Sequence, residues 1–224
     1  MIDLSKQFEF FEPNNKVPIN IVGCGSVGST IAENLVRCGL TNIILWDFDD
    51  VESHNIVNQM FRAKDFGRPK VEALRDLLAE INPDCANTVK LQPKGWNGDM
   101  MSGYIFLAVD SIELRKAIVE QHFNNIYVKA MFDVRTLLTG AQARCAVWNN
   151  RALKQTFLDS MQFSDADAED AVPVSACGVV LGVVTTVRLI SAMCVNNFIK
   201  LCKGEETWKY IEIDGFSGEL LCFK

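Results

Sequence analysis

Residues 17–28 read VPINIVGCGSVG, and this stretch decides the fold of the chain. The apolar run Pro18–Val22 predicts a buried strand that passes directly into a Gly-x-Gly-x-x-Gly turn. The amphipathic stretch Ser26–Cys38 then predicts a helix, and Asn42–Asp47 predicts a second strand. Strand, glycine turn, helix and strand in this order are typical of a nucleotide-binding βαβ unit.

The three glycines have distinct expected roles in such a turn. Gly23 permits the tight turn off the strand, and Gly25 lets the backbone approach a phosphate. Gly28 lets the helix pack close to the sheet, so that the positive end of the helix dipole faces that phosphate. Asp47 ends the second strand, where an acid can accept hydrogen bonds from ribose hydroxyls. The alternative is a turn of this type that binds no ligand.

Further motifs follow in order along the chain. They are DFDDV at residues 47–51, NIVNQ at 55–59, GRPKVE at 67–72, INP at 81–83, Asp110 with Arg115 after an apolar strand, and CGVVLGVV at 177–184. On these motifs the chain from Val17 to about Lys200 resembles the adenylating superfamily of ubiquitin-activating enzymes and the ThiF, MoeB and HesA activators. It resembles a divergent member of that superfamily.

The resemblance and the βα pattern imply one α/β domain over residues 1–224. We expect a Rossmann-like open twisted sheet, mostly parallel with an antiparallel C-terminal part, and helices on both faces. Further strands are predicted at Thr88–Gln92, Tyr104–Val109, Ile126–Phe132 and Leu137–Trp148, further helices at Pro69–Asn82 and Ser111–Phe123, and a hairpin at Trp208–Phe223. Residues 1–16 are a polar lead-in with room for a short helix. A crossover segment is expected at about residues 152–176, and its acidic part, Asp159–Asp170, is predicted to be mobile.

The resemblance implies an ATP-dependent adenylyltransferase. Its substrate would be the C-terminal carboxylate of a small ubiquitin-like or sulfur-carrier protein, or of a peptide, and it would use ATP with Mg²⁺ and form a homodimer. One alternative is a catalytically impaired nucleotide-binding scaffold or partner subunit. A second is an NAD-binding oxidoreductase, because the glycine turn and Asp47 fit a dinucleotide equally well. A dehydrogenase, however, does not need the motifs between residues 55 and 70.

The resemblance also implies roles for individual residues. Asp110 would hold Mg²⁺ on the nucleotide phosphates, or it would cap the helix that starts near Ser111, and the two roles are compatible. Lys70 would neutralise the triphosphate, or it would be a solvated lysine at a helix N-terminus. Arg115 is expected to be a structural ion-pair partner. The remaining nucleotide contacts would come from Asp49, Asn55, Asn58 and Gln59. The alternative for Asp49 is a solvated loop acid, and the alternative for Asn55 is a loop cap.

Two positions bear on turnover. Asn58 stands where the family carries an arginine that stabilises triphosphate charge, and it lacks both the charge and the forked donor. Because the spacer after Gln59 is one residue short, Arg62 is the candidate substitute for the arginine, although a surface position would also explain it.

Cys177 is a candidate nucleophile at a helix entry, with a small buried residue as the alternative.

Composition narrows the class of protein. The chain has 224 residues, 22 Lys and Arg against 28 Asp and Glu, and a net charge of −6, without the basic clusters that nucleic-acid binding requires. The polar first residues and the lack of a long charge-free apolar run predict a cytoplasmic protein without a membrane segment. Eight scattered cysteines without a Cys-x-x-Cys pair predict neither a disulfide framework nor a structural zinc site.

Overall fold

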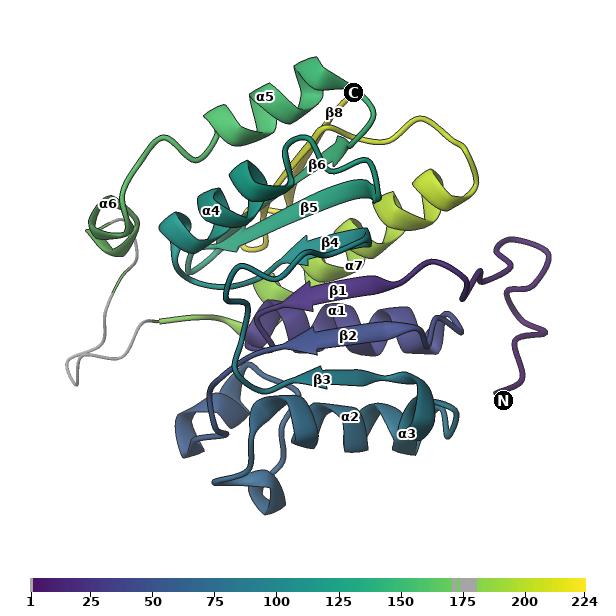
Figure 1. Ribbon diagram of the computed structural model, residues 1–224. Coiled ribbons are helices and arrows are strands. Elements are labelled where there is room, and N and C mark those ends of the chain that lie inside the picture. The colour runs from purple at the N-terminus through teal and green to yellow at the C-terminus, as the bar shows by residue number, and fades with distance from the viewer. Residues whose placement is uncertain (1, 171–172, 174–180) are drawn as a thin grey trace.

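The computed structural model of the chain describes residues 2–170, 173 and 181–224. These residues form one eight-stranded sheet of order β3-β2-β1-β4-β5-β6-β7-β8 (Figure 1). The parallel part contains β3 (Lys90–Gln92), β2 (Ile43–Trp46), β1 (Ile19–Val22), β4 (Gly103–Leu107) and β5 (Val128–Thr136). The antiparallel part adds β6 (Gly140–Val147), β7 (Tyr210–Asp214) and β8 (Glu219–Phe223). The expected α/β class with an antiparallel C-terminal part is therefore confirmed.

Helices cover both faces of this sheet. On one face, α1 (Ser26–Arg37), α2 (Lys70–Ile81) and α7 (Val184–Cys202) contribute to a single buried cluster. On the other face, α4 (Ile112–His122) and α5 (Arg151–Asp159) contribute to a second cluster. Four short helices complete the described elements: η1 (Ser53–Val57), η2 (Ala63–Asp65), α3 (Cys85–Thr88) and α6 (Asp165–Asp170).

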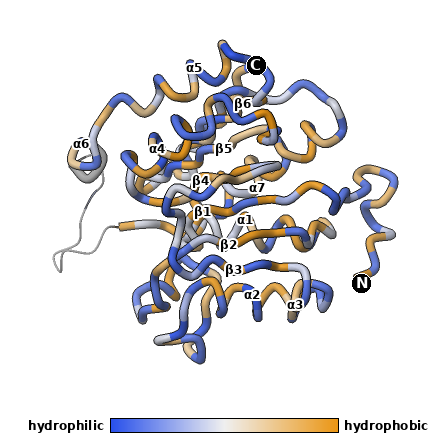
Figure 2. The backbone as a smooth tube through the Cα atoms, in the orientation of Figure 1, coloured by the Kyte–Doolittle hydropathy of each residue, from blue (hydrophilic) through white to orange (hydrophobic). Residues whose placement is uncertain are grey.

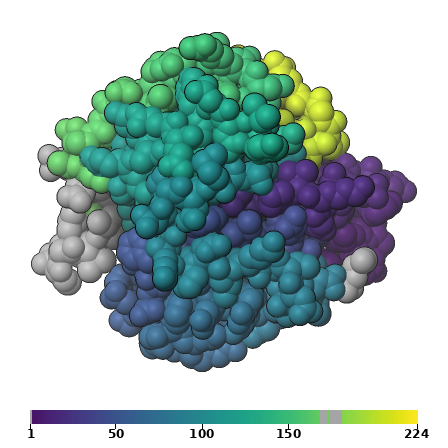
Figure 3. Space-filling view, viewed as in Figure 1, coloured from purple at the N-terminus to yellow at the C-terminus, as the bar shows by residue number. Residues whose placement is uncertain are grey.

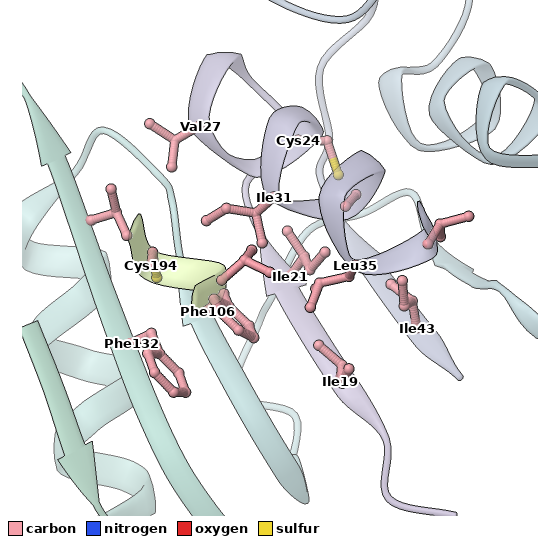
Figure 4. Close-up of a cluster of buried hydrophobic side chains, with 14 of the residues drawn as sticks. Ile19, Ile21, Cys24, Val27, Ile31, Leu35, Ile43, Phe106, Phe132 and Cys194 are labelled. Carbon is pink, nitrogen blue, oxygen red and sulfur yellow. The ribbon is translucent and has the colours of Figure 1, made fainter. Parts of the chain in front are cut away.

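The two clusters follow from the alternation of side chains along the strands. In β4, Phe106 joins the first cluster, whereas its neighbours Ile105 and Leu107 join the second. Phe106 stacks on Phe132 with ring centroids 4.6 Å apart, and Figure 4 shows both rings beside the side chains of α1 and β1. Figure 2 shows the same organisation along the chain, with hydrophobic residues on the central strands and hydrophilic ones at the periphery.

The predicted strand and helix ends mostly agree with the structure to within two residues. The largest differences are at β5, which continues to Thr136, and at β6, which begins only at Gly140. The lead-in over residues 2–16 contains turns rather than a helix. Figure 3 shows this N-terminal segment, in purple, against the body of the molecule. Phe11 is buried, and Gln7 Nε2 donates a 2.8 Å hydrogen bond to the Cys38 carbonyl.

The segment predicted as a crossover contains two helices, α5 and α6. The N-terminus of α5 is capped by Asn150, whose side chain accepts from the Leu153 N–H, and Phe157 buries its apolar side. The start of α6 is likewise fixed by Ser164, whose hydroxyl hydrogen-bonds Asp167 at 2.7 Å. These caps explain why an acidic, apolar-poor stretch is helical here. Among the residues that the structure describes, no helix has both the length and the apolar character to cross a membrane.

Candidate functional site

The glycine turn lies at the carboxyl edge of β1, between the ends of β2 and β4. Gly23 has φ +92°, and a Cβ there would lie 2.6 Å from the Ala108 carbonyl oxygen. A Cβ at Gly28 would lie 1.8 Å from the Gly23 carbonyl oxygen. Both positions therefore need glycine for packing, and the turn is held directly against the loop that follows β4.

Gly25 differs from these two glycines because open space lies beside it. It is the N-cap of α1, without a side-chain cap, and a Cβ there would meet only Gln59 Nε2, at 4.0 Å. The N-terminus of α1 is thus an uncapped positive end beside open space that a side chain at position 25 would occupy, and we call this space the Gly25 cradle. This is the geometry that suits a phosphate.

Asp47 fixes the shape of the turn from β2. Its Oδ2 accepts from the Cys24 N–H at 2.6 Å, and its Oδ1 accepts from the Asp49 N–H at 2.8 Å. Burial raises the pKa of the Asp47 carboxyl, and these N–H donors oppose that rise. The neighbouring Cys24 side chain is fully buried in the core, where burial holds its pKa well above the usual thiol value (Figure 4).

Lys70 and Asp49 form an ion pair next to the turn, with Nζ 2.8 Å from Oδ2. The Lys70 side chain is 9% exposed and that of Asp49 is 50% exposed. The Lys70 N–H also donates to the Asp49 carbonyl at 2.9 Å, so α2 begins directly against the chain after β2. The alternative of a solvated Lys70 is therefore wrong, because the ammonium is buried and its carboxylate partner faces solvent.

The NIVNQ motif lies over the start of α1. Asn55 is buried, and its Oδ1 accepts from the Glu52 N–H at 2.9 Å, so it serves as a loop cap. Gln59 directs Nε2 toward Gly25, while its buried Oε1 has no hydrogen-bond partner among the described residues. The Asn58 amide reaches another part of the chain, because a Cβ at Gly182 would lie 2.8 Å from its Nδ2.

Asp110 lies exposed in the loop between β4 and α4, and no described residue hydrogen-bonds or pairs with its carboxylate. The cap of α4 is Ser111, whose Oγ accepts from the Leu114 N–H at 3.0 Å. The interpretation of Asp110 as a helix cap is therefore wrong. Arg115 holds this loop in place, because its guanidinium donates hydrogen bonds to the Leu107 and Val109 carbonyls.

Arg115 is buried and forms an ion pair with Asp133 of β5, as expected for a structural residue. Asp133 in turn pairs with Arg135, which donates to the Ser160 carbonyl at 3.0 Å. Two arginines around one buried carboxylate thus connect the Asp110 loop, β5 and the end of α5.

Sequence reasoning missed one residue beside this loop. The Asp165 carboxylate of α6 accepts from the Ile112 and Glu113 N–H groups, and Glu113 Oε1 accepts from the Asp165 N–H at 2.9 Å. Asp165 therefore fastens the crossover segment to the N-terminus of α4, next to Asp110. Because 53 residues separate Asp165 from Ile112, local sequence contains no signal for this contact.

One predicted residue, Arg62, is engaged outside this arrangement. Arg62 pairs with Asp65, at 3.2 Å, and with Glu80, so its guanidinium is engaged by two carboxylates. Cys177 lies outside the described residues.

The arrangement of the acidic side chains bears on whether this edge of the sheet suits Mg²⁺. Within the described ranges, no three His, Cys, Asp or Glu side chains come together as a metal cage. Asp110 offers a carboxylate that no described residue engages, at the same edge of the sheet as the Gly25 cradle. That suits Mg²⁺, which is commonly held by one or two carboxylates together with substrate phosphates and water.

Comparison with known proteins relates this site to a family. The ThiF family model matches residues 11–223. Ubiquitin-like modifier-activating enzyme 5 of Caenorhabditis briggsae is 35% identical over 119 residues, which are 45% of this chain and 27% of that protein. The enzyme of the same name from Arabidopsis thaliana is 43% identical over 74 residues, which are 33% of this chain and 17% of that protein. The matched segments thus span less than a third of either relative.

Solved structures share the fold at low identity. Escherichia coli MccB, in a crystal structure with ATP, has a TM-score of 0.66 at 18% identity over 93% of this chain and 63% of that one. PaaA has a TM-score of 0.69 at 16% identity over 94% of this chain and 64% of that one. Another MccB structure contains MccA and has a TM-score of 0.71 at 17% identity over 93% of this chain and 63% of that one.

Proposed function

The chain belongs to the ThiF family, and from that premise we propose that it is an ATP-dependent adenylyltransferase. Its substrate in this proposal is the C-terminal carboxylate of a small ubiquitin-like or sulfur-carrier protein, or of a peptide. The carboxylate attacks the α-phosphate of ATP, which gives an acyl-adenylate and releases pyrophosphate. The names of the similar proteins support this substrate class, because they include ubiquitin-like modifier activation and a peptide complex.

One observation carries the proposal. The buried Lys70–Asp49 pair lies beside the open Gly25 cradle at the carboxyl edge of the sheet. A lysine that is already desolvated, with a carboxylate that can turn to solvent, is a preformed partner for a triphosphate. A site for NAD has no need of this pair, so the oxidoreductase alternative is not favoured.

The residues of the chain divide the work of binding ATP. The uncapped start of α1 receives phosphate oxygens through backbone N–H groups, and Lys70 neutralises their charge. Asp47 orients the turn and is placed near the ribose. Gln59 presents an amide donor beside the phosphate and a buried, unpaired oxygen that a ligand hydroxyl would satisfy.

Asp110 would hold the Mg²⁺. When bound, the ion supplies positive charge against the phosphate oxygens. The part played by the chain is to keep the Asp110 loop in place, which Arg115 and Asp165 do from two sides.

We place the carrier protein on the outer part of the sheet. The β7–β8 hairpin exposes apolar side chains at Phe216, Leu220, Leu221 and Phe223, and their exposed fractions range from 50% to 79%. Exposed apolar side chains on a rigid hairpin suit docking of a protein partner. As for related enzymes, we expect a homodimer and a cytoplasmic location.

A catalytically impaired scaffold is the second candidate. Asn58 has no guanidinium, and the guanidinium of Arg62 is engaged by Asp65 and Glu80. In that case ATP would bind without turnover unless an arginine came from elsewhere in the chain or from a partner.

Two measurements in sequence test these proposals. The first is thermal unfolding with ATP–Mg²⁺, AMP and NAD⁺ in parallel, where adenylation predicts a shift with ATP–Mg²⁺. The second is pyrophosphate exchange into ATP with small ubiquitin-like proteins, each compared with the same protein carrying a C-terminal amide. Exchange that requires the free carboxylate supports the enzyme. ATP binding without exchange for any carrier supports the scaffold, and a shift with NAD⁺ alone overturns both.

A further inference from the structure

A second concave site lies at the opposite edge of the sheet from the glycine turn. It has a volume of about 540 Å³. Its walls include Tyr104, near the start of β4, and Val128, the first residue of β5. Both strands run parallel to β1, so their first residues lie at the amino edge, whereas the glycine turn follows the last residue of β1.

The pocket concentrates positive charge in an acidic protein. Lys129, Arg151 and Lys154 line it, and no Asp or Glu does. Among the described residues, none of these three cations forms an ion pair with a carboxylate; Lys154 Nζ donates only to the Phe123 carbonyl, at 2.7 Å. Three neighbouring cations without an anion repel one another, and a bound anion would remove that repulsion.

Burial adds to this effect at Lys154. The Nζ lies 5.3 Å from the Trp148 ring centroid and 5.6 Å from that of Phe123, so the ammonium rests over aromatic side chains. Burial lowers the pKa of Lys154, and the nearby Arg151 lowers it further. A cation in this position gains more from an anionic partner than a fully solvated one does.

The backbone adds a further positive element. α5 begins at Arg151, on the rim of the pocket, and has nine residues. Asn150 caps the Leu153 N–H, whereas the N–H groups of Arg151 and Ala152 donate to no described residue. The positive end of this helix therefore lies at the rim of the pocket, where Asn149 and Arg151 line it.

We propose that this pocket binds the phosphate group of a small phosphomonoester. A phosphomonoester places about −1.5 to −2 charges and three acceptor oxygens on one group at neutral pH, which suits a pocket lined by three cations better than a single carboxylate does. The volume falls in the usual range for small-molecule sites, about 300 to 1,000 Å³. Tyr104 and Phe123 provide apolar surface for the organic part of the ligand.

Fluorine NMR on protein labelled with fluorotryptophan tests the proposal at both edges of the sheet. Of the four tryptophans, Trp148 lines the pocket and Trp46 ends β2 beside Asp47, so each reports on one edge. Trp148→Phe and Trp46→Phe assign their signals. We expect AMP and, more weakly, inorganic phosphate to shift the Trp148 signal to saturation. The Trp46 signal reports binding at the glycine turn, so failure of one site is distinguished from failure of the other.

Charge variants then show whether the response depends on the cations of the pocket or only on the net charge of the protein. Arg151→Gln and Lys154→Gln should each weaken the Trp148 response by about tenfold, as for the loss of one charge-assisted hydrogen bond. Lys90→Gln removes the same charge from exposed β3 and should leave it unchanged. Because Arg151 is exposed, its variant keeps the fold even if Lys154→Gln disturbs the packing over Trp148.

Three results would overturn the proposal. In the first, AMP and phosphate move the Trp46 signal alone. In the second, Lys90→Gln weakens the Trp148 response as much as Arg151→Gln does. In the third, a glutamate-rich peptide shifts Trp148 whereas phosphate and AMP do not, which would assign the pocket to an acidic protein segment.

Discussion

The buried ammonium of Lys70 lies 2.8 Å from the half-exposed carboxylate of Asp49, and a backbone hydrogen bond of 2.9 Å joins the same two residues. The pair is asymmetric, because one charge has left water and the other has not. Removing either partner therefore has a different consequence, and that difference can be measured.

We predict that Asp49→Asn destabilises the ligand-free protein more than Lys70→Met does. Asp49→Asn leaves a buried ammonium without a carboxylate, at a cost of about 1–2 kcal/mol, whereas Lys70→Met leaves an acid that water can solvate. Urea unfolding measures both. ATP–Mg²⁺ should still stabilise Asp49→Asn, because phosphate can take the place of the carboxylate. Equal stabilisation of Lys70→Met by ATP–Mg²⁺ would show that Lys70 does not contact the nucleotide.

Two alanine substitutions in the glycine turn should have different effects, one on folding and the other on ATP binding. A Cβ at Gly28 would lie 1.8 Å from a carbonyl oxygen, so Gly28→Ala should cost about 3 kcal/mol or more. Gly25→Ala meets no atom nearer than 4.0 Å and should fold, but it should lose the stabilisation by ATP because the methyl group would occupy the space that we propose for the phosphate. Circular dichroism and thermal shift with ATP–Mg²⁺ check the two. A Gly25→Ala protein that still responds fully to ATP would place the phosphate elsewhere.

Asp110→Ala should abolish the Mg²⁺-dependent part of ATP binding while changing the stability of the free protein by less than about 0.5 kcal/mol. The reason is that Asp110 is exposed and has no partner among the described residues. Asp159→Ala, which removes an exposed acid from α5, is the matched control. Titration calorimetry with and without Mg²⁺ gives the comparison. If both variants bind ATP–Mg²⁺ equally well, Asp110 is not the metal ligand.

Asp47 should make the stability of the folded protein depend on pH. Burial raises its pKa above the usual 3.8 in the folded protein, so the folded state holds the proton more tightly than the unfolded state. The contribution of Asp47 to stability is therefore complete below about pH 4 and is lost as the pH rises through the folded pKa. Asp47→Asn lacks this loss.

The readout is the difference in unfolding free energy between wild type and Asp47→Asn, followed from about pH 4 to pH 7. We expect the unfolding free energy of the wild type to fall relative to that of Asp47→Asn as the pH rises. The hydrogen bonds that the substitution alters contribute a constant offset to this difference. A difference that does not change with pH would mean that the Asp47 pKa is not raised.

Alkylation should separate the cysteines by burial. Burial raises the pKa of Cys85 to about 11 and that of Cys145 to about 12, so both remain protonated thiols near neutral pH. With iodoacetamide at about pH 8, both should react only after unfolding. Mass spectrometry of a digest measures this, and the same digest reports whether Cys177 is reactive. Rapid labelling of Cys145 in the native protein would contradict its burial.

Much of the sheet edge that carries the glycine turn could be predicted from sequence because its signals are local. Strand, glycine turn and helix occupy residues 19–37, and steric need fixes Gly23 and Gly28. The pairing of Lys70 with Asp49 was harder to predict from the sequence. A lysine at a helix start indicates a nearby anion, but the residue that supplies it in the absence of ligand depends on how two loops meet.

The crossover region shows what local patterns miss. α5 has a readable signal, namely Asn150 as a cap followed by Leu153 and Phe157 at helical spacing, yet the polar residues around them obscured it. Asp165 has no such signal, because its partners at the start of α4 are more than 50 residues away in sequence. Tertiary contacts, rather than propensity, decide the structure of this segment.

The support of the Asp110 loop by Arg115 has a consequence for how the site can change over time. Arg115 holds the loop through main-chain carbonyls and is anchored by Asp133, so the loop keeps its course whatever side chain stands at position 110. Substitutions at that position can alter chemistry without loss of foldability. Single substitutions at position 110 could therefore remove or restore the acid during evolution while the protein still folds. The same loop could in this way present different side chains, and so support different chemistry.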